Sequence, residues 1–277
     1  MIELHNEDFY LVKDLIERKN KFRPEAIAVV DGNNPGWIFV DSKDNPITAL
    51  IWCKGMEGFH LIGDCENNTF ISGLNSFIDG YLVQRLKDVG FNDFEVSGDP
   101  GWEQTIEDVF SSRGLCVGKQ IVYTFKKSDF NINQVSHVPQ GFYLQSISNV
   151  LEKSKEYENI EFLLNIIESF WGTKTNFLSK GVGYCITTDK WIVSTAYTGF
   201  IAGSTYTIGI ETVKDYRRRG FAELVAQEVK KAHMNLGANS YWDCMKDNVA
   251  SYNLAEKLGF IKEYEYNVYW FSLNSKN

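Results

Sequence analysis

Three consecutive arginines stand between an apolar run and a helical pattern, and these residue types suit phosphate binding. Residues Thr205–Thr212 predict a strand, Arg217–Arg219 and Gly220 follow, and the apolar spacing from Phe221 predicts a helix. A helix N-terminus presents N–H groups without intrahelical partners and the positive end of the helix dipole. A glycine there lets ligand oxygens approach the backbone. The segment predicts a phosphate or pyrophosphate site, and the alternative interpretation is a solvated basic turn.

The elements that must position this segment are predicted across the second half of the chain. Hydrophobic periodicity and glycine-containing turns separate strands from helices there. We expect strands at Tyr143–Ser146, Gly183–Thr187, Trp191–Gly199, Thr205–Thr212, Ser240–Cys244 and Tyr264–Phe271, and helices over about 149–170, from Gly220 onward and over about Ala250–Leu258.

The first half shows a comparable alternation of helices and strands. Its apolar residues follow helical spacing near the N-terminus and form short strand-like runs further on. We expect a helix near Phe9–Ile16, strands at Ala26–Val30, Trp37–Val40, Ile47–Cys53 and Gly58–Gly63, a helix over Leu74–Val89, a strand at Phe94–Val96, a helix over Glu103–Ser112 and a strand at Lys119–Phe125.

A polar stretch over 126–140, with neither helical nor alternating periodicity, separates the two halves. Such stretches are typical of linkers. We therefore predict a first domain at 1–130, a linker at 131–140 and a second domain at 141–277.

The ends of the two halves resemble each other. Arg113–Leu115 precedes Val122–Phe125 in the first half, as Leu258–Phe260 precedes Val268–Phe271 in the second, each after helix, strand and short helix. This similarity favours two copies of one α/β fold. The alternative is coincidence, because helices often end at glycine before a strand.

Composition limits the possible classes of function. The 277 residues are 44% hydrophobic and carry a net charge of −8, which indicates a folded protein without a broad cationic surface. We therefore expect no nucleic-acid and no membrane partner. The five cysteines form no CxxC pair and no cluster with histidine, so we expect no metal site and reduced thiols. No export signal or long apolar run is present, and we expect a cytoplasmic protein.

The arginine segment resembles a known loop. Arg217-x-x-Gly220-x-Ala222 is similar to the R/Q-x-x-G-x-G/A pyrophosphate loop of the GNAT superfamily of acetyl-CoA-dependent N-acetyltransferases. The stretch from Asn248 to Phe260 resembles the helix and exit of the same fold. A finer resemblance, strongest over 170–260, is to the subfamily that includes zwittermicin A resistance acetyltransferases, and it is carried by Ile210–Thr212, Tyr216–Arg217, Trp242–Cys244 and Ala255–Phe260. The resemblance implies a mixed α/β GNAT acyl-CoA N-acyltransferase fold, with a catalytic C-terminal domain and a degenerate GNAT-like N-terminal half. The acidic stretch Asp64–Asn68 replaces the basic loop there, so we expect that half to bind no coenzyme A.

The resemblance also assigns roles to individual residues around acetyl-CoA. Backbone groups of the strand would bind the pantetheine arm, backbone amides of the loop and first helical turn would hold the pyrophosphate, and arginines would supply charge. Asn248 has an alternative interpretation as the N-cap of the following helix. The implied coenzyme-binding residues are Ile210, Thr212, Val213, Arg217, Arg218, Arg219, Gly220, Phe221, Ala222, Asn248 and Ser251.

The catalytic groups are less clearly marked. Many members of the family protonate the thiolate with a tyrosine seven residues after the asparagine, where this chain has Ala255. Glu211 is the candidate general base, able to take the proton of the amine through water. Strand alternation places Glu211 on the face opposite Ile210 and Thr212, so only a bulge would turn it into the cleft. The alternative is a solvent-facing or structural carboxylate.

Aromatic residues of the second half are candidates for the acceptor pocket. Trp171 and Tyr197 would suit a small polar amine with an apolar part, although both residues are equally explicable as core. We expect an enzyme that acetylates a primary amine of a small molecule, such as an antibiotic or an amino-acid-like compound, and that is a monomer or a homodimer. The alternative is a non-catalytic acyl-CoA-binding sensor, with which Ala255 is consistent.

Overall fold

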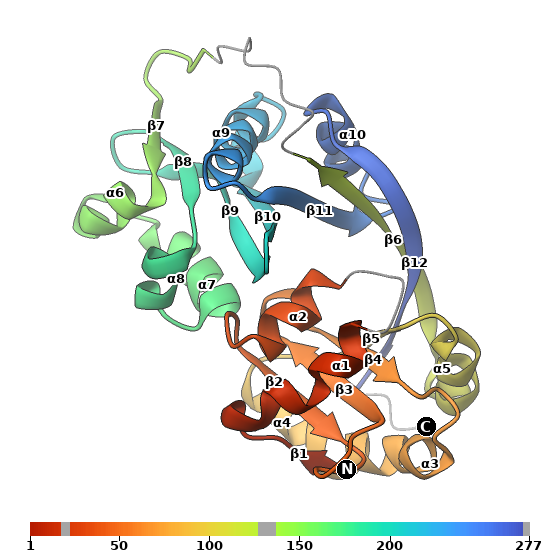
Figure 1. Cartoon of the computed structure of the whole chain (residues 1–277). Helices are drawn as coiled ribbons and strands as arrows, with labels where there is room; N and C mark the ends of the chain where they lie inside the picture. Colours follow the sequence, from red (N-terminus) through yellow and green to blue (C-terminus); the bar gives the residue numbers. More distant parts are fainter. Residues whose placement is uncertain (18–22, 127–136, 274–277) are drawn as a thin grey trace. The chain divides into compact units, whose positions relative to one another are not determined.

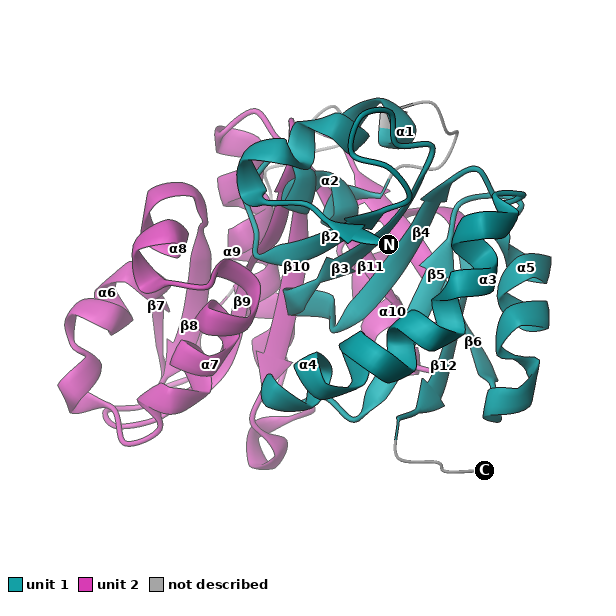
Figure 2. Cartoon of the chain, turned by 90° about the horizontal axis from the view of Figure 1, so that it is seen from below, with its two compact units in different colours: residues 1–120, 265–277 teal, residues 121–264 magenta. Residues whose placement is uncertain are grey.

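The contacts of the chain divide it into two units, which Figure 2 colours separately. The computed structural model describes residues 1–17, 23–126 and 137–273. Unit 1 consists of 1–120 and 265–277, and unit 2 consists of 121–264. Residues 131–136 of the predicted linker lie outside the described residues.

Unit 1 is built on a sheet with the strand order β1-β2-β3-β4-β5-β12. Strands β1 to β4 pair antiparallel, β4 and β5 pair parallel, and β5 pairs antiparallel with β12. The parallel pair requires a crossover, which three consecutive helical segments supply. The strands are β1 Ile2–Glu3, β2 Gly36–Val40, β3 Thr48–Cys53, β4 Gly58–Gly63, β5 Asp93–Gly98 and the C-terminal part of β12 Ile261–Ser272.

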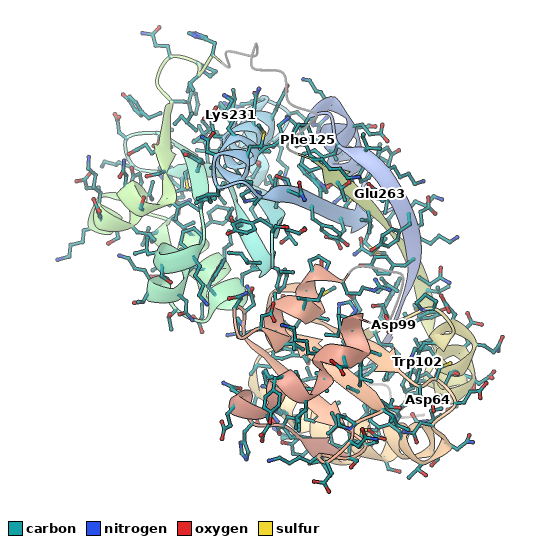
Figure 3. All side chains as sticks on the ribbon, viewed as in Figure 1. Asp64, Asp99, Trp102, Phe125, Lys231 and Glu263 are labelled. Atoms are coloured by element: carbon teal, nitrogen blue, oxygen red, sulfur yellow. The ribbon has the colours of Figure 1, made fainter. Side chains whose placement is uncertain are left out.

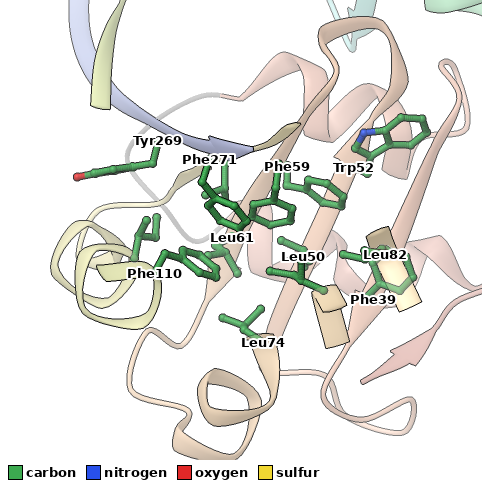
Figure 4. Close-up of a cluster of buried hydrophobic side chains, with 14 of the residues drawn as sticks. Phe39, Leu50, Trp52, Phe59, Leu61, Leu74, Leu82, Phe110, Tyr269 and Phe271 are labelled. Atoms are coloured by element: carbon green, nitrogen blue, oxygen red, sulfur yellow. The ribbon is translucent and has the colours of Figure 1, made fainter. Parts of the chain in front are cut away.

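Helices bury the apolar faces of this sheet. Figure 4 shows Phe271 of β12 packed against Phe110 of a helix, in a buried cluster that also contains Phe59 of β4. The crossover helix is continuous but includes one π-helical turn, Ile78–Leu82. The helices are α1 Lys13–Glu17, α2 Pro24–Val30, α3 Asn68–Phe77, α4 Val83–Asp88 and α5 Trp102–Phe110.

Unit 2 repeats the strand order of unit 1, with the sequence β7-β8-β9-β10-β11-β6. Strands β7 to β10 pair antiparallel, and β10 and β11 pair parallel through a crossover that contains one long helix. The strands are β6 Cys116–Phe125, β7 Tyr143–Ser146, β8 Gly183–Thr187, β9 Ile192–Ala202, β10 Thr205–Thr212 and β11 Asn239–Met245.

The sheet of unit 2 lies between two layers of helices (Figure 1). One apolar cluster joins the sheet to α9 and α10, and a second joins its other face to α6, α7 and α8. Strand β9 is buried along its whole length because both of its faces are covered. The helices are α6 Ile147–Glu152, α7 Ile160–Trp171, α8 Lys174–Lys180, α9 Phe221–Asn235 and α10 Val249–Lys257.

The two units exchange their last strands. The end of β6, the last strand of the first half in sequence, belongs to unit 2. There Phe125, which Figure 3 labels, packs against Phe260 and the Lys230 ammonium. The end of β12 belongs to unit 1, where Tyr269 pairs with Val96. The predicted domains 1–130 and 141–277 differ from these units because they assign each strand to the half that contains it in sequence.

One predicted strand is wrong. Residues Ala26–Val30 form most of helix α2. Pro24 occupies the first turn, where its fixed φ favours a helix and its missing N–H costs no hydrogen bond. Six of the seven residues of α2 are buried, so the segment has no polar face and its sequence resembles that of a buried strand.

Within the described residues no helix is long and apolar enough to cross a membrane.

Each unit contains one fully buried histidine bonded to hydroxyl groups. In unit 2, His233 of α9 lies 2.9 Å from the Thr198 hydroxyl through Nε2 and 3.0 Å from the Ser240 hydroxyl through Nδ1. In unit 1, His60 Nδ1 lies 2.7 Å from the Ser97 hydroxyl. Burial disfavours the imidazolium and lowers the pKa of each histidine to about 3, and the Arg23 guanidinium adds to this effect at His60. Both side chains are therefore neutral in the folded protein at pH 7.

We expect acid to destabilise the fold through these two histidines. An unfolded histidine binds a proton near pH 6.5, whereas the folded ones do so only at about pH 3. The free energy of unfolding should therefore fall by about 1.4 kcal/mol per pH unit per histidine as pH drops below about 6.5. Urea unfolding between about pH 7 and about pH 5 measures this slope. It should become shallower in His233→Asn and stay unchanged in His5→Asn, whose site is exposed; equal slopes in all three proteins would contradict the expectation.

Candidate active site

Strands β10 and β11 diverge in the middle of unit 2. Their parallel pairing covers only Thr205–Thr207 of β10. The register of β10 against β9 shifts between Tyr206 and Ile208, at the same level. Among the described residues the two strands do not pair beyond this point, and β10 continues towards the predicted pyrophosphate loop. Strands that separate in this way leave ladder groups that an extended ligand can bind.

The loop after β10 ends in a helix start without a side-chain cap. A short 3₁₀ turn, Lys214–Tyr216, leads to Arg217, and α9 begins at Phe221 with Gly220 as N-cap. Gly220 has φ of 79° and Arg218 has φ of 60°, which is uncommon for a residue with a side chain. Alternation of such conformations turns successive N–H groups to one side and creates an anion-binding concavity. The predicted site residues Arg218 to Ala222 thus form one continuous backbone surface.

The three arginines are exposed, and two of them donate to backbone carbonyls. Arg217 Nε donates to the Thr212 carbonyl at 3.1 Å, and an Arg219 Nη donates to the Asp215 carbonyl at 3.2 Å. In the described part of the chain, none of the three arginines forms an ion pair within 4.0 Å. Their charges remain available to an anionic ligand.

Backbone groups of Thr212 and Val213, which are predicted to contact the pantetheine arm, form hydrogen bonds within the protein. The Thr212 carbonyl accepts from Arg217, and the Val213 N–H donates to the Val193 carbonyl at 3.0 Å. The Thr212 hydroxyl lies 2.8 Å from that of Ser194. These bonds fix the end of β10, while Ile210 packs against the α9 side of the sheet.

Helix α10 follows β11, the strand from which β10 diverges. The Asn248 side chain caps it by accepting from the Ser251 N–H at 3.2 Å, which is the alternative interpretation that the sequence allows. Only the Oδ1 atom is used in this bond. The Ser251 hydroxyl accepts a hydrogen bond from Trp242 Nε1 at 3.0 Å. Asn248 and Ser251 therefore lie on one turn of α10, joined to strand β11.

Glu211 lies on the opposite face of β10 from Ile210. The register shift precedes Ile208, so alternation along the rest of the strand places Glu211 on the same face as Gly209. Desolvation by surrounding protein raises the pKa of Glu211, and the Arg217 guanidinium partly offsets this effect. A carboxylate with a raised pKa is a better proton acceptor at neutral pH than an ordinary one.

Tyr197 of β9 lies beside this carboxylate. Its ring lies over Gly209, where a Cβ would collide with the ring atoms. Burial and the negative charge of Glu211 both raise the pKa of the Tyr197 phenol well above its ordinary value. Phe170 of α7 packs edge-on against the same ring at 5.2 Å. Tyr197 and Glu211 thus share the face of the sheet that α7 covers.

Trp171, the other predicted acceptor residue, belongs to the core. It is 1% exposed, packs against Phe177, and donates its indole N–H to the Thr198 carbonyl at 2.9 Å. We leave Trp171 out of the acceptor site because no polar group of the indole remains for a ligand.

Unit 1 has a different structure at the equivalent turn. After β4, Asp64 and Glu66 occupy the turn, and the Asn67 side chain caps α3 by accepting from the Phe70 N–H at 3.2 Å (Figure 3 labels Asp64). An anion there would meet carboxylates and a helix start whose N–H group is already bonded. The described residues of both units contain no group of three or more His, Cys, Asp or Glu side chains that could hold a metal ion.

The comparison with family models identifies the chain. Residues 19–269 match the model of the GNAT acetyltransferase family. The chain belongs to this family. The predicted mixed α/β GNAT fold and the enzyme class, an N-acetyltransferase, are thereby confirmed.

Proteins that match the chain over nearly its whole length support this assignment. The chain is 24% identical over 271 residues, 97% of each protein, to an uncharacterized N-acetyltransferase, YdfB, of Bacillus subtilis (strain 168). A GCN5-related N-acetyltransferase-like protein from Streptococcus suis 89/1591 shares the fold with a TM-score of 0.65 at 23% identity, covering 96% of this chain and 98% of that one. A tandem GNAT protein from the clavulanic acid biosynthesis pathway has a TM-score of 0.61 at 11% identity, covering 100% and 99%. The tandem architecture agrees with the predicted two-half organisation.

Sequence patterns do not predict two features of this GNAT site. Trp242 reaches Ser251 from a different element, and Gly209 makes room for the Tyr197 ring. A glycine within a strand pattern is the one local signal that indicates such a close approach. Nothing in the sequence marks the contact between Trp242 and Ser251.

Proposed function

We propose that unit 2 transfers an acetyl group from acetyl-CoA to a primary amine of a small molecule. The observation that carries this proposal is the uncapped start of α9, with exposed Arg217–Arg219, at the open end of β10. The residues fit the donor, since backbone N–H groups and unpaired guanidiniums together complement a pyrophosphate.

The chain's own residues divide the work of the reaction. The amides from Arg218 to Ala222 bind the pyrophosphate, the end of β10 orients the pantetheine arm, and Asn248 donates to that arm through its amide nitrogen. Glu211 accepts a proton from the ammonium through water, which leaves a neutral amine to attack the acetyl carbon. Bound acetyl-CoA supplies the activated acyl group. Positioning of the two substrates provides most of the remaining rate enhancement.

For the acceptor, we propose a small amine with an apolar part. The exposed Glu211 carboxylate attracts an ammonium group, and the buried ring of Tyr197, packed against Phe170, supports this face of β10 from behind. The finer resemblance to zwittermicin A resistance acetyltransferases favours an antibiotic or an amino-acid-like compound. We propose that unit 1 binds no coenzyme A, because its equivalent turn is acidic and capped.

A second candidate function is an acyl-CoA-binding sensor without turnover. Ala255, fully buried where many relatives have a tyrosine, is the observation that favours it. The sensor would use the same loop and helix start to bind acetyl-CoA. Turnover alone separates the two candidates.

Calorimetric titration with acetyl-CoA, with ATP as the nucleotide control, tests both functions. We expect acetyl-CoA to bind with a Kd on the order of micromolar and ATP to bind much more weakly. A screen of amines monitored by thiol release then distinguishes the enzyme from the sensor. Folded protein that binds no acetyl-CoA would contradict both functions.

A further inference from the structure

Unit 1 contains a cavity of its own, apart from the candidate site of unit 2. Its volume is about 510 Å³, which is within the range of small-molecule sites. Its walls are the helical segment from Asn6 to Glu17, the turn between β2 and β3, and the end of β4. The lining residues that bear on a ligand are Leu11, Asp14, Leu15, Asp44, Ile47 and Asp64, the last of which Figure 3 labels.

Hydrogen bonds and a close backbone contact fix the walls of this cavity. The Asp41 carboxylate accepts from the Ile47 and Thr48 N–H groups at 3.1 and 3.2 Å, which holds the turn between β2 and β3. The Asp64 N–H donates to the Ile47 carbonyl at 2.8 Å, and a Cβ atom at Gly63 would collide with the same carbonyl oxygen. A ligand site whose walls are already in place loses less free energy to ordering when it binds.

Part of the lining is apolar. Leu15 is buried, Leu11 is half-buried, and the Ile47 side chain is 42% exposed. An alkyl chain laid against these side chains would remove apolar surface of both partners from water. The cavity therefore favours a ligand with a hydrocarbon part.

The charged part of the lining is acidic. Asp14, Asp44 and Asp64 contribute carboxylates, and among the described residues no lysine or arginine lines the cavity. Lys43, in the turn beside it, pairs with Asp8 at 2.6 Å. Charges of one sign that line a concave surface reinforce one another, so they attract an ammonium group and repel an anion. The ligand that fits this lining is a cation.

We propose that this cavity of unit 1 binds a small organic cation, an ammonium group carried on an alkyl chain. The alkyl chain packs against Leu11, Leu15 and Ile47, and the ammonium group lies among the carboxylates. This site goes beyond the function proposed for unit 2, and it does not depend on the binding of acetyl-CoA there.

Titration of the full-length protein with n-hexylamine, followed by nuclear magnetic resonance, tests the proposal. Labelled isoleucine methyl groups locate the ligand, because Ile47 reports on this cavity and Ile210 reports on unit 2. We expect the Ile47 signal to move with a Kd on the order of millimolar, since a small monoamine has few atoms with which to bind. Hexanoate has the same kind of chain with the opposite charge and should leave the Ile47 signal in place. High salt should weaken the binding of n-hexylamine, because it screens the carboxylates.

Matched variants distinguish the charge of the cavity from the net charge of the protein. Asp44→Asn/Asp64→Asn should raise the Kd of n-hexylamine roughly tenfold or more. Asparagine at 64 keeps an oxygen for the Glu66 N–H, which the Asp64 carboxylate accepts at 2.9 Å. Asp88→Asn/Asp93→Asn removes two charges from exposed positions outside the lining and should bind like the wild type.

Two results would overturn this proposal without touching the proposed function of unit 2. One is an Ile47 signal that does not move in the wild-type protein, or that moves equally with hexanoate. The other is the same Kd for n-hexylamine in both double variants. Glu211→Gln should leave the Ile47 titration unchanged, and a loss of the Ile47 shift in that variant would place the ligand in unit 2 instead.

Discussion

Replacing Glu211 with glutamine should lower kcat by roughly a hundred- to ten-thousand-fold, the usual contribution of a general base. Glutamine keeps the size and polarity of the side chain but cannot accept the proton of the ammonium. The Kd of acetyl-CoA should stay within about twofold, because Glu211 lies on the face of β10 opposite Ile210. Thiol release with an amine found in the screen measures kcat, and calorimetry measures the Kd.

The pH profile provides an independent readout for Glu211. Its raised pKa means that the wild-type enzyme should lose activity as pH falls through a value above the ordinary one for glutamate, since the base becomes protonated. Glu211→Gln should lose that limb of the profile. Glu161→Gln, on the exposed surface of α7, is the control and should keep wild-type kinetics. Full activity of folded Glu211→Gln would show that another group takes the proton.

Gly220→Asp should weaken acetyl-CoA binding by roughly a hundredfold or more, because a like charge against an anion costs several kcal/mol. The new carboxylate would stand at the start of α9, and its residue would have to adopt the φ of 79° that glycine accepts without strain. Titration of the variant with acetyl-CoA measures the loss, and circular dichroism reports whether the fold persists.

Two further variants distinguish the effect of the added negative charge on acetyl-CoA binding from the effect of replacing glycine at a positive φ. Gly220→Asn adds a neutral side chain that tolerates positive φ, and it should weaken binding much less than Gly220→Asp. Gly203→Asp places the same carboxylate at an exposed turn with φ of 56°, away from the loop. It should leave acetyl-CoA affinity unchanged. If Gly220→Asp binds as tightly as Gly203→Asp, the pyrophosphate site lies elsewhere.

Local patterns predicted most elements of the fold because each pattern depends only on neighbouring residues. Helix α9 followed from its single apolar stripe, and strand β10 from a short run between turns. The pattern of helix α2 indicates a strand because burial on nearly every side removes the helical period from the sequence. Tertiary packing, which the sequence does not display, decides such segments.

The candidate site also has parts that the sequence predicts and parts that it does not. The loop from Arg217 to Ala222 is contiguous, so its residue types and order were sufficient to indicate it. The contact of Trp242 with Ser251 joins a strand to a helix, and its geometry depends on how both elements pack. Trp171 shows the converse, because an aromatic residue has the same sequence appearance in a pocket as in a core.

Because the two units exchange β6 and β12, neither half of the chain can be deleted without removing a strand from the other unit. A deletion of the first half from the gene would also remove β6 and leave β11 as a bare sheet edge, which invites aggregation. It would leave the end of β12 without the sheet that it completes. The catalysis that we propose for unit 2 therefore requires unit 1 as well, whether or not unit 1 has any chemistry of its own.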